Sequence, residues 1–340
     1  PSDMYVQGYD GSGVAKLRLW QAKAPDFDMS SFSLGNYSTA MSKSASAELI
    51  SKVLYPNDNH VEGKILRLRQ QYFLSAASIG DIVQNHLSTY GTLENLPDMV
   101  AIQLNDTHPT LAIPEMMRIL LDECGFDWDK SFEICQKVFS YTNHTVMAEA
   151  LEKWNVDIFK MTLPRIYQIV AEMDRRCRIE LNKAFPGDKG KIDYMALLGD
   201  NQVRMANICA YTANSINGVS KLHSEIIKQS VFHDYYLYKP AAFKNVTNGI
   251  AYRRWLLGAN PGLCKLLDET IGTEYKHDAS ALSKLNAYAG DKTVLTELNK
   301  IKLANKQEFA NYLAKSTGQV IDPNSIFDCQ VKRMHEYKRQ

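Results

Sequence analysis

The sequence of 340 residues has almost no excess charge of either sign and no long apolar run. Its 39 lysines and arginines stand against 38 aspartates and glutamates, which leaves a net charge of +1. Proteins that bind the nucleic-acid backbone usually carry a clear basic excess, so this balance argues against a nucleic-acid partner. No apolar run approaches the roughly 20 residues of a membrane-spanning helix, and we expect no membrane partner either.

Cysteine is sparse, and its spacing forms no CxxC pair. The six cysteines are Cys124, Cys135, Cys177, Cys209, Cys264 and Cys329. Such scattered positions are typical of reduced, mostly buried thiols in a cytoplasmic protein. The chain also opens without an initiator methionine or a signal peptide, and we expect both of its ends to be cut.

Several familiar catalytic motifs are missing as well. The sequence has no GxSxG elbow, Walker loop, GxGxxG or HExxH. His108, His144, His223 and His335 are far apart and lack a two-ligand spacing on one helix, so we predict no metal site. His223, beside apolar residues of a helical segment, has the features of a structural histidine at the edge of the core.

What the sequence does contain is a repeated order of strand, polar turn and helix. Hydrophobic residues make up 45% of the chain and charged residues 23%, which is ordinary for a globular protein of about two domains. Helices are expected over 36–55, 63–86, 147–154 and 219–229, and a strand over 14–24. Further short apolar runs lie at 99–104, 137–141, 213–218, 243–246 and 326–331. This alternation predicts an α/β protein with a mostly parallel sheet, whose ligand crevice lies beyond the carboxyl ends of the strands.

The turns after these strands are rich in asparagine, histidine, threonine and aspartate. One turn contains Asp106 and His108, another His144, and a third Asn248. Asparagine and histidine each donate and accept hydrogen bonds, as a sugar hydroxyl does, so the turns suit a polyhydroxylated ligand. Helix capping by the same residue types is the simpler interpretation of any single turn.

The chain closes on a basic cluster, VKRMHEYKRQ. Lys332, Arg333 and Lys338 suit an anion with several oxygens, such as a phosphate. A solvated basic helix face fits the same residues equally well. The local sequence leaves these two interpretations even.

Five long segments resemble the α-glucan phosphorylases, the family of glycogen, starch and maltodextrin phosphorylases. They are AIQLNDTHPTLAIPEMMRILLD, YTNHTVMAEALEKW, INGVSKLHSEIIK, NVTNGIAYRRWL and VKRMHEYKRQ. Two shorter ones, VLYPNDNHVEGK and LRLWQAKAP, match as well. The resemblance runs in order along nearly the whole chain, and the chain is identified as a member of this family.

The resemblance implies a glycosyltransferase that removes terminal α-1,4-linked glucose from a glucan with inorganic phosphate. The product is α-glucose 1-phosphate, formed with retention of configuration. The cofactor implied is pyridoxal 5'-phosphate, whose phosphate assists proton transfer. The implied fold is a two-lobed, doubly wound glycosyltransferase (GT-B type) α/β fold. Residues 1–247 would belong to the N-terminal, glucan-binding lobe and 248–340 to the start of the C-terminal, cofactor lobe.

The resemblance also implies roles for individual residues. Asn248 and His144 would hydrogen-bond the glucose 6-hydroxyl, and the His144 carbonyl would stabilise positive charge on the sugar. Asp106 and His108 would wall the glucose subsite. The substrate phosphate and the cofactor phosphate would be held by Arg333 and Lys338, with Lys332 as a further cofactor contact.

Two further segments have counterparts in the family. Asp58 and Asn59 resemble the mobile loop that gates the crevice, and residues 36–53 resemble the helix of the family's homodimer contact.

The lysine that binds the cofactor covalently lies, in the family, in a glycine-rich stretch of a kind that this sequence does not contain. The glycine-rich loop expected in the first lobe is missing too. We therefore expect an internal fragment that is inactive by itself and, with an incomplete sheet, poorly soluble. Two rivals remain: a nucleotide-sugar glycosyltransferase, and a non-catalytic glucan-binding fragment or degenerate paralogue.

Overall fold

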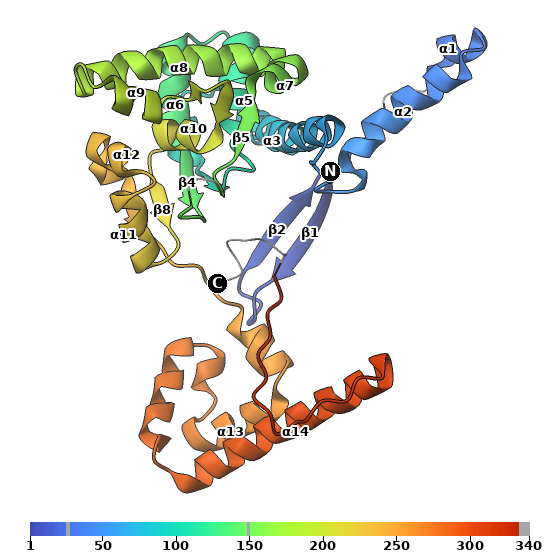
Figure 1. Ribbon diagram of the computed structural model, residues 1–340, viewed down its shortest axis with the longest axis vertical. Coiled ribbons are helices and arrows are strands. Elements are labelled where there is room, and N and C mark those ends of the chain that lie inside the picture. The colour runs from blue at the N-terminus through green and yellow to red at the C-terminus, as the bar shows by residue number, and fades with distance from the viewer. Residues whose placement is uncertain (25–27, 148–149, 333–340) are drawn as a thin grey trace. The chain divides into compact units, whose positions relative to one another are not determined.

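The computed structural model describes residues 1–24, 28–147 and 150–332. The chain folds as two compact units, Pro1–Asn248 and a second that begins at Gly249 (Figure 1). Each unit is described by itself below.

The first unit begins with a hairpin and three helices. They are β1 (Ser2–Gln7), β2 (Val14–Leu19), α1 (Met29–Ser33), α2 (Tyr37–Lys52) and α3 (Val61–Tyr90). β1 and β2 pair antiparallel, and the hairpin is attached to α3 through Arg18, whose guanidinium bridges Asp3 and Asp81. The predicted strand within 14–24 and the two predicted helices are confirmed.

One face of α3 is buried, and the residues on it recur every three or four positions. Leu68, Gln71, Ser75, Ile79, Val83 and His86 lie on this face. The helix begins where His60 Nδ1 accepts the Gly63 N–H at 3.0 Å. It ends at Gly91, which adopts a left-handed backbone with φ of +70°.

The centre of the first unit is a parallel sheet with the strand order β3-β4-β8-β9. Its strands are β3 (Ile102–Asn105), β4 (Phe139–Asn143), β8 (Ile216–Gly218) and β9 (Phe243–Asn245). The short apolar runs at 99–104, 137–141, 213–218 and 243–246 therefore contribute neighbouring strands of one sheet, as the sequence predicts. This mixed helix and parallel-sheet architecture agrees with the α/β class expected from the sequence.

Helices connect these strands. They are α4 (Leu96–Met99), α5 (Ala112–Arg118), the π-helical turn η1 (Ile119–Glu123), α6 (Trp128–Val138), α7 (Val156–Thr162), α8 (Pro164–Ala184), α9 (Lys189–Met195), α10 (Met205–Thr212), α11 (Lys221–Gln229), α12 (His233–Tyr238) and the 3₁₀ turn η3 (Pro240–Ala242). Helix α5 packs against α6 and α8, and α10 packs against α6 and β4 (Figure 1).

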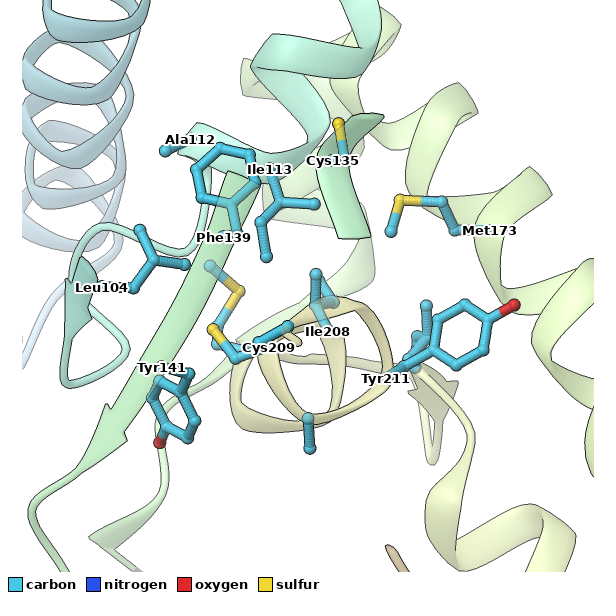
Figure 2. Close-up of a cluster of buried hydrophobic side chains, with 14 of the residues drawn as sticks. Leu104, Ala112, Ile113, Cys135, Phe139, Tyr141, Met173, Ile208, Cys209 and Tyr211 are labelled. Atoms are coloured by element: carbon cyan, nitrogen blue, oxygen red, sulfur yellow. The ribbon is translucent and has the colours of Figure 1, made fainter. Parts of the chain in front are cut away.

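The core of this unit lies between β4 and the surrounding helices, as Figure 2 shows. Phe139 and Tyr141 of β4 are fully buried, and so are Ile113 of α5 and Cys209 of α10. Removal of these side chains from water is the main force that holds helices and sheet together.

A second, small sheet corrects one expectation. Residues 147–154 are predicted as a helix, but β5 (Lys153–Asn155) is a strand that pairs antiparallel with β7 (Gln202–Arg204), which also pairs with β6 (Leu198–Gly199). Trp154 is 6% exposed within the core. Burial of this indole and pairing with β7 override the local helical composition.

The described part of the second unit, residues 249–332, contains helices and no strand. Its elements are the π-helical turn η4 (Arg254–Gly258), α13 (Pro261–Ile271), the 3₁₀ segments η5 (Glu274–Lys276) and η6 (Ala279–Tyr288), and α14 (Lys292–Thr317). The strand expected at 326–331 is wrong: these residues have no regular secondary structure and are exposed. An isolated apolar run has no neighbouring strand here to satisfy its backbone groups, so it does not become a strand.

Candidate functional site at the carboxyl edge of the parallel sheet

A row of hydrogen bonds ties together the carboxyl ends of the four parallel strands. Gln103 Nε2 donates to Thr142 Oγ1 at 2.8 Å, and Asn217 Nδ2 donates to the same oxygen at 3.4 Å. Asn217 also exchanges two hydrogen bonds with the backbone of Val246, of 2.6 and 3.1 Å. The turns that follow β3, β4 and β9 therefore leave one braced edge of the sheet.

The turn after β3 places Asp106 and His108 at this edge. Asp106 adopts a left-handed backbone with φ of +63°, and its N–H donates to the Thr142 carbonyl at 2.9 Å. Its Oδ1 accepts the Thr107 N–H at 2.7 Å. Aspartate tolerates this conformation because its short side chain bonds the local backbone. His108 is half-buried and meets the Tyr55 ring edge-on, with 5.9 Å between the ring centroids.

Beneath this turn lies a carboxylate that the sequence analysis missed. Glu152 accepts hydrogen bonds from Thr107 Oγ1 at 3.1 Å and from Gln71 Nε2 at 2.8 Å, and Arg67 Nη2 lies 3.9 Å away. Glu152 and Arg67 stand in stretches of helical composition, where single charged residues are commonplace. No signal in the sequence separates them from surface charges.

The loop before α3 contains Asp58 and Asn59. Asp58 pairs with Arg67 at 2.5 Å, and the Arg67 guanidinium lies 5.6 Å from the centroid of the Tyr55 ring. Asn59 is exposed, and its N–H donates to Asn57 Oδ1 at 2.9 Å. The loop is thus attached to α3 through Arg67, on the same guanidinium that approaches Glu152.

A cavity of about 280 Å³ lies between α3, this loop and β3. Most of its wall is apolar, including Leu54, Leu74 and Ile79, whereas Arg67, Gln71 and His108 supply polar groups. Of the predicted site residues, His108 lines this cavity, and Asp58 pairs with Arg67, which lines it too.

The turn after β4 contains His144, which is exposed while its predecessor Asn143 is fully buried. Tyr141 donates its hydroxyl to Asn143 Oδ1 at 3.1 Å, and the Asn143 amide donates to the Thr145 carbonyl. Burial raises the pKa of Tyr141 well above its ordinary value, so this phenol remains a neutral donor. The residues on both sides of His144 are therefore anchored, and His144 itself faces solvent.

His223 anchors the same turn from α11. The Val219 N–H donates to His223 Nδ1 at 3.1 Å, and His223 Nε2 lies 3.4 Å from the Thr145 carbonyl. The expected structural role of His223 is confirmed in that it is half-buried and hydrogen-bonded on both ring nitrogens.

The remaining predicted residues lie at or beyond the end of the first unit. Asn248 is exposed, three residues past β9. Lys332 is exposed in the second unit, and Arg333 and Lys338 lie outside the described residues. Among the residues that the structure describes, no group of three or more histidine, cysteine, aspartate or glutamate side chains is arranged to hold a metal ion. No described helix combines the length and the apolar character needed to cross a membrane.

Comparison with known proteins decides the family. The model of the carbohydrate phosphorylases matches residues 1–340. The chain belongs to the carbohydrate phosphorylase family. It is 46% identical over 352 aligned residues to the muscle form of glycogen phosphorylase from Bos taurus and from Oryctolagus cuniculus, and to the liver form from Homo sapiens. Each alignment covers 100% of this chain and 42% of the relative.

This phosphorylase-family chain thus spans less than half the length of those glycogen phosphorylases. The motifs that carry the family resemblance in the sequence include three of the turns at the braced edge of the sheet, those after β3, β4 and β9. The resemblance inferred from the sequence is confirmed.

Proposed function

We propose that this chain supplies the glucose subsite of an α-glucan phosphorylase, which transfers the terminal α-1,4-linked glucose of glycogen or maltodextrin to inorganic phosphate. The product is α-glucose 1-phosphate. One observation carries the proposal: Asp106, His144 and Asn248 follow β3, β4 and β9, and these strands end at one edge of a parallel sheet. Ligand crevices of α/β proteins lie at this edge.

In this proposal the neutral polar groups of the turns recognise the sugar hydroxyls. Asn248 and His144 bind the glucose 6-hydroxyl, and the His144 carbonyl faces the positive charge that develops on the sugar. Asp106 and His108 form the wall of the subsite. Asp58 and Asn59, on the loop that Arg67 holds, control access to it. Groups fixed in place before the reaction stabilise developing charge without reorganisation, and the anchored turns provide such groups.

Phosphate recognition in this proposal belongs to the basic segment that begins at Lys332. Lys332 is exposed, and lysine and arginine, the residue types at 332, 333 and 338, are donors suited to phosphate oxygens. These residues fit the phosphate of pyridoxal 5'-phosphate as well as the substrate phosphate. When bound, that cofactor would supply a phosphate group for acid–base chemistry. The lysine for its covalent attachment is not among the lysines that match the family motifs here.

The architecture proposed is the two-lobed, doubly wound glycosyltransferase (GT-B type) fold. Residues 1–247 would form part of the glucan-binding lobe, and residues 248–340 would begin the cofactor lobe. The six cysteines are free, which supports the cytoplasm as the location.

A homodimer is proposed through α2. This helix exposes Tyr37, Met41 and Leu49, each at least half exposed, and large apolar side chains on one helix are typical of a surface that a partner covers.

The test is an assay of glucose 1-phosphate formation from glycogen and phosphate. We expect the complete protein that carries this chain to form product and the 340-residue chain alone to form none. In the complete protein, Asn248→Ala and His144→Ala remove hydrogen bonds to the sugar and should lower kcat/KM at least about tenfold. Product formation by the isolated chain would contradict the expectation that it is inactive, and unchanged kinetics of both variants would contradict the site.

A glucan-binding protein without catalysis is the second candidate, since the polar turns suit a sugar whether or not it reacts. Binding of maltopentaose by the complete protein, together with no phosphorolysis, would favour this candidate. Transfer of glucose from a nucleotide sugar to the glucan, with release of the nucleotide, would instead favour the nucleotide-sugar glycosyltransferase.

A further inference from the structure

The His144 turn is held from both sides by hydrogen bonds to one carbonyl. Thr145 O accepts from the Asn143 amide, and His223 Nε2 lies 3.4 Å from it. Asn143 is itself fixed by the buried Tyr141. Among the described residues, nothing hydrogen-bonds the His144 side chain. The orientation of the His144 carbonyl and imidazole therefore depends on the backbone that these two donors hold.

The hydrogen bond at the other ring nitrogen selects the tautomer of His223. Nδ1 accepts the Val219 N–H at 3.1 Å, so it carries no proton. In a neutral imidazole the proton must then be on Nε2, which makes Nε2 the donor that faces the Thr145 carbonyl. The Val219 N–H thus determines that His223 Nε2 is the hydrogen-bond donor to the Thr145 carbonyl in the turn after β4.

The position of His223 is itself tightly defined by the end of the sheet. Ser220 caps α11 by accepting the His223 N–H at 3.0 Å. A Cβ on Gly218 would lie 2.2 Å from Ser224 Oγ, so only glycine lets α11 approach β8 this closely. Asn245 of β9 donates to both Gly218 O and Ser224 Oγ, at 3.0 and 2.9 Å. The imidazole of His223 is therefore held in a fixed position next to the carboxyl ends of β8 and β9.

We propose that His223 is a positioning residue: its Nε2–H tautomer, selected by the Val219 N–H, holds the Thr145 carbonyl and thereby orients His144 toward the sugar. This inference rests on the proposed function for the identity of the ligand, but the clamp itself is a property of the described residues. His223 touches no substrate in this scheme.

Two substitutions separate the role of the His223 hydrogen bond to Thr145 from that of its hydrogen bond with Val219. In His223→Asn the short amide keeps an acceptor near the Nδ1 position for Val219 and loses the donor to Thr145. In His223→Gln the longer amide keeps a donor near the Nε2 position and loses the acceptor for Val219. If the hydrogen bond from Nε2 to the Thr145 carbonyl positions His144, the asparagine variant perturbs His144. If only the hydrogen bond from the Val219 N–H to Nδ1 matters, the glutamine variant perturbs it instead.

The first measurement is NMR of the complete protein that carries this chain, labelled with ¹⁵N-histidine. We expect His223 Nδ1 to be the unprotonated nitrogen, and the His144 resonances to shift in His223→Asn but not in His223→Gln. Protonation of His223 at Nδ1, or a His144 shift confined to His223→Gln, would overturn the proposal. This readout needs no activity, so it stands even if the proposed function fails.

The second measurement is phosphorolysis kinetics of the complete protein. A misplaced reacting group costs up to about 100-fold in rate, so we expect His223→Asn to lower kcat by about 10- to 100-fold with little change in KM for phosphate. His223→Gln should retain most of kcat. A wild-type kcat in His223→Asn overturns the inference, whereas absence of phosphorolysis in the wild-type protein overturns the proposed function and leaves the NMR result to decide the clamp.

Discussion

Arg67 and Asp58 form an ion pair of 2.5 Å that attaches the loop before α3 to the second turn of the helix. The same guanidinium lies over Tyr55 and near Glu152. A residue on a rigid helix thus connects the proposed gating loop with the carboxylate beneath the Asp106 turn.

Arg67→Met should free this loop while changing global stability little. Both partners are partly exposed, and such pairs contribute about 0.2–1 kcal/mol. We expect faster hydrogen exchange at residues 54–60 and almost the same urea midpoint. Asp58→Asn is the matched variant, because it removes the same pair and leaves the Arg67–Glu152 approach intact. If exchange in the loop is unchanged in both variants, the ion pair does not hold the loop.

Gly63→Ala should destabilise the first unit. A Cβ at this position would lie 1.9 Å from the Asn57 carbonyl oxygen, so loop and helix must separate, at a cost of about 1–3 kcal/mol. Gly80→Ala is the control in the same helix, since nothing lies within 4 Å of its added Cβ. It should stabilise by about 0.5–1 kcal/mol. Thermal unfolding of both variants decides the matter, and equal shifts of the two would refute the steric argument.

Glu115→Leu should be among the most costly single changes in the first unit. Glu115 is 2% exposed and accepts from Tyr72 at 2.8 Å and from Arg118 at 2.8 and 2.9 Å. Removing one partner of a buried ion pair costs about 3–5 kcal/mol. Glu123→Gln removes the exposed partner of Arg118 and should cost less than about 1 kcal/mol. Urea unfolding compares the two, and similar losses would contradict the importance of burial here.

Lys239 should make unfolding free energy rise with pH between 8 and 9. Burial lowers its pKa from 10.5 to about 8, so between these values the unfolded chain binds more protons than the folded one. Folding is then favoured as pH rises, by about 1 kcal/mol over that unit. Buried thiols act in the opposite direction: burial raises the pKa of Cys209 to about 12, and the unfolded thiols ionise above pH 9.

The effect of Lys239 is therefore measured as the difference in unfolding free energy between the wild type and Lys239→Met. Lys239→Met removes the titration but shares the cysteines, whose contribution cancels in the comparison. It also removes the donors to the Tyr211 and Ala213 carbonyls at the end of α10, an offset that does not change between pH 8 and 9. The unfolding free energy of the wild type relative to the variant should grow by about 1 kcal/mol from pH 8 to 9. A constant difference in urea unfolding would show that Lys239 is not desolvated.

The sequence by itself determined the α/β class, the long helices and the parallel strands that carry the polar turns. These follow from local properties: apolar periodicity, helical composition, and turns rich in asparagine and aspartate. The family also followed from the sequence, because its motifs are long contiguous stretches. The prediction that Asp106, His108 and His144 belong to the site rests on the same motifs.

Only the tertiary structure decided which residues act on those turns. Glu152 binds Thr107, Arg67 lies near Glu152, and His223 contacts the Thr145 carbonyl. The two residues of each pair are 40 or more positions apart in the sequence. Single charged residues or histidines leave no local pattern that would predict such contacts. The same holds for Trp154, whose burial and pairing with β7 turned an expected helix into β5. Hydrogen bonds and burial between distant segments depend on how the chain packs, and local composition does not contain that information.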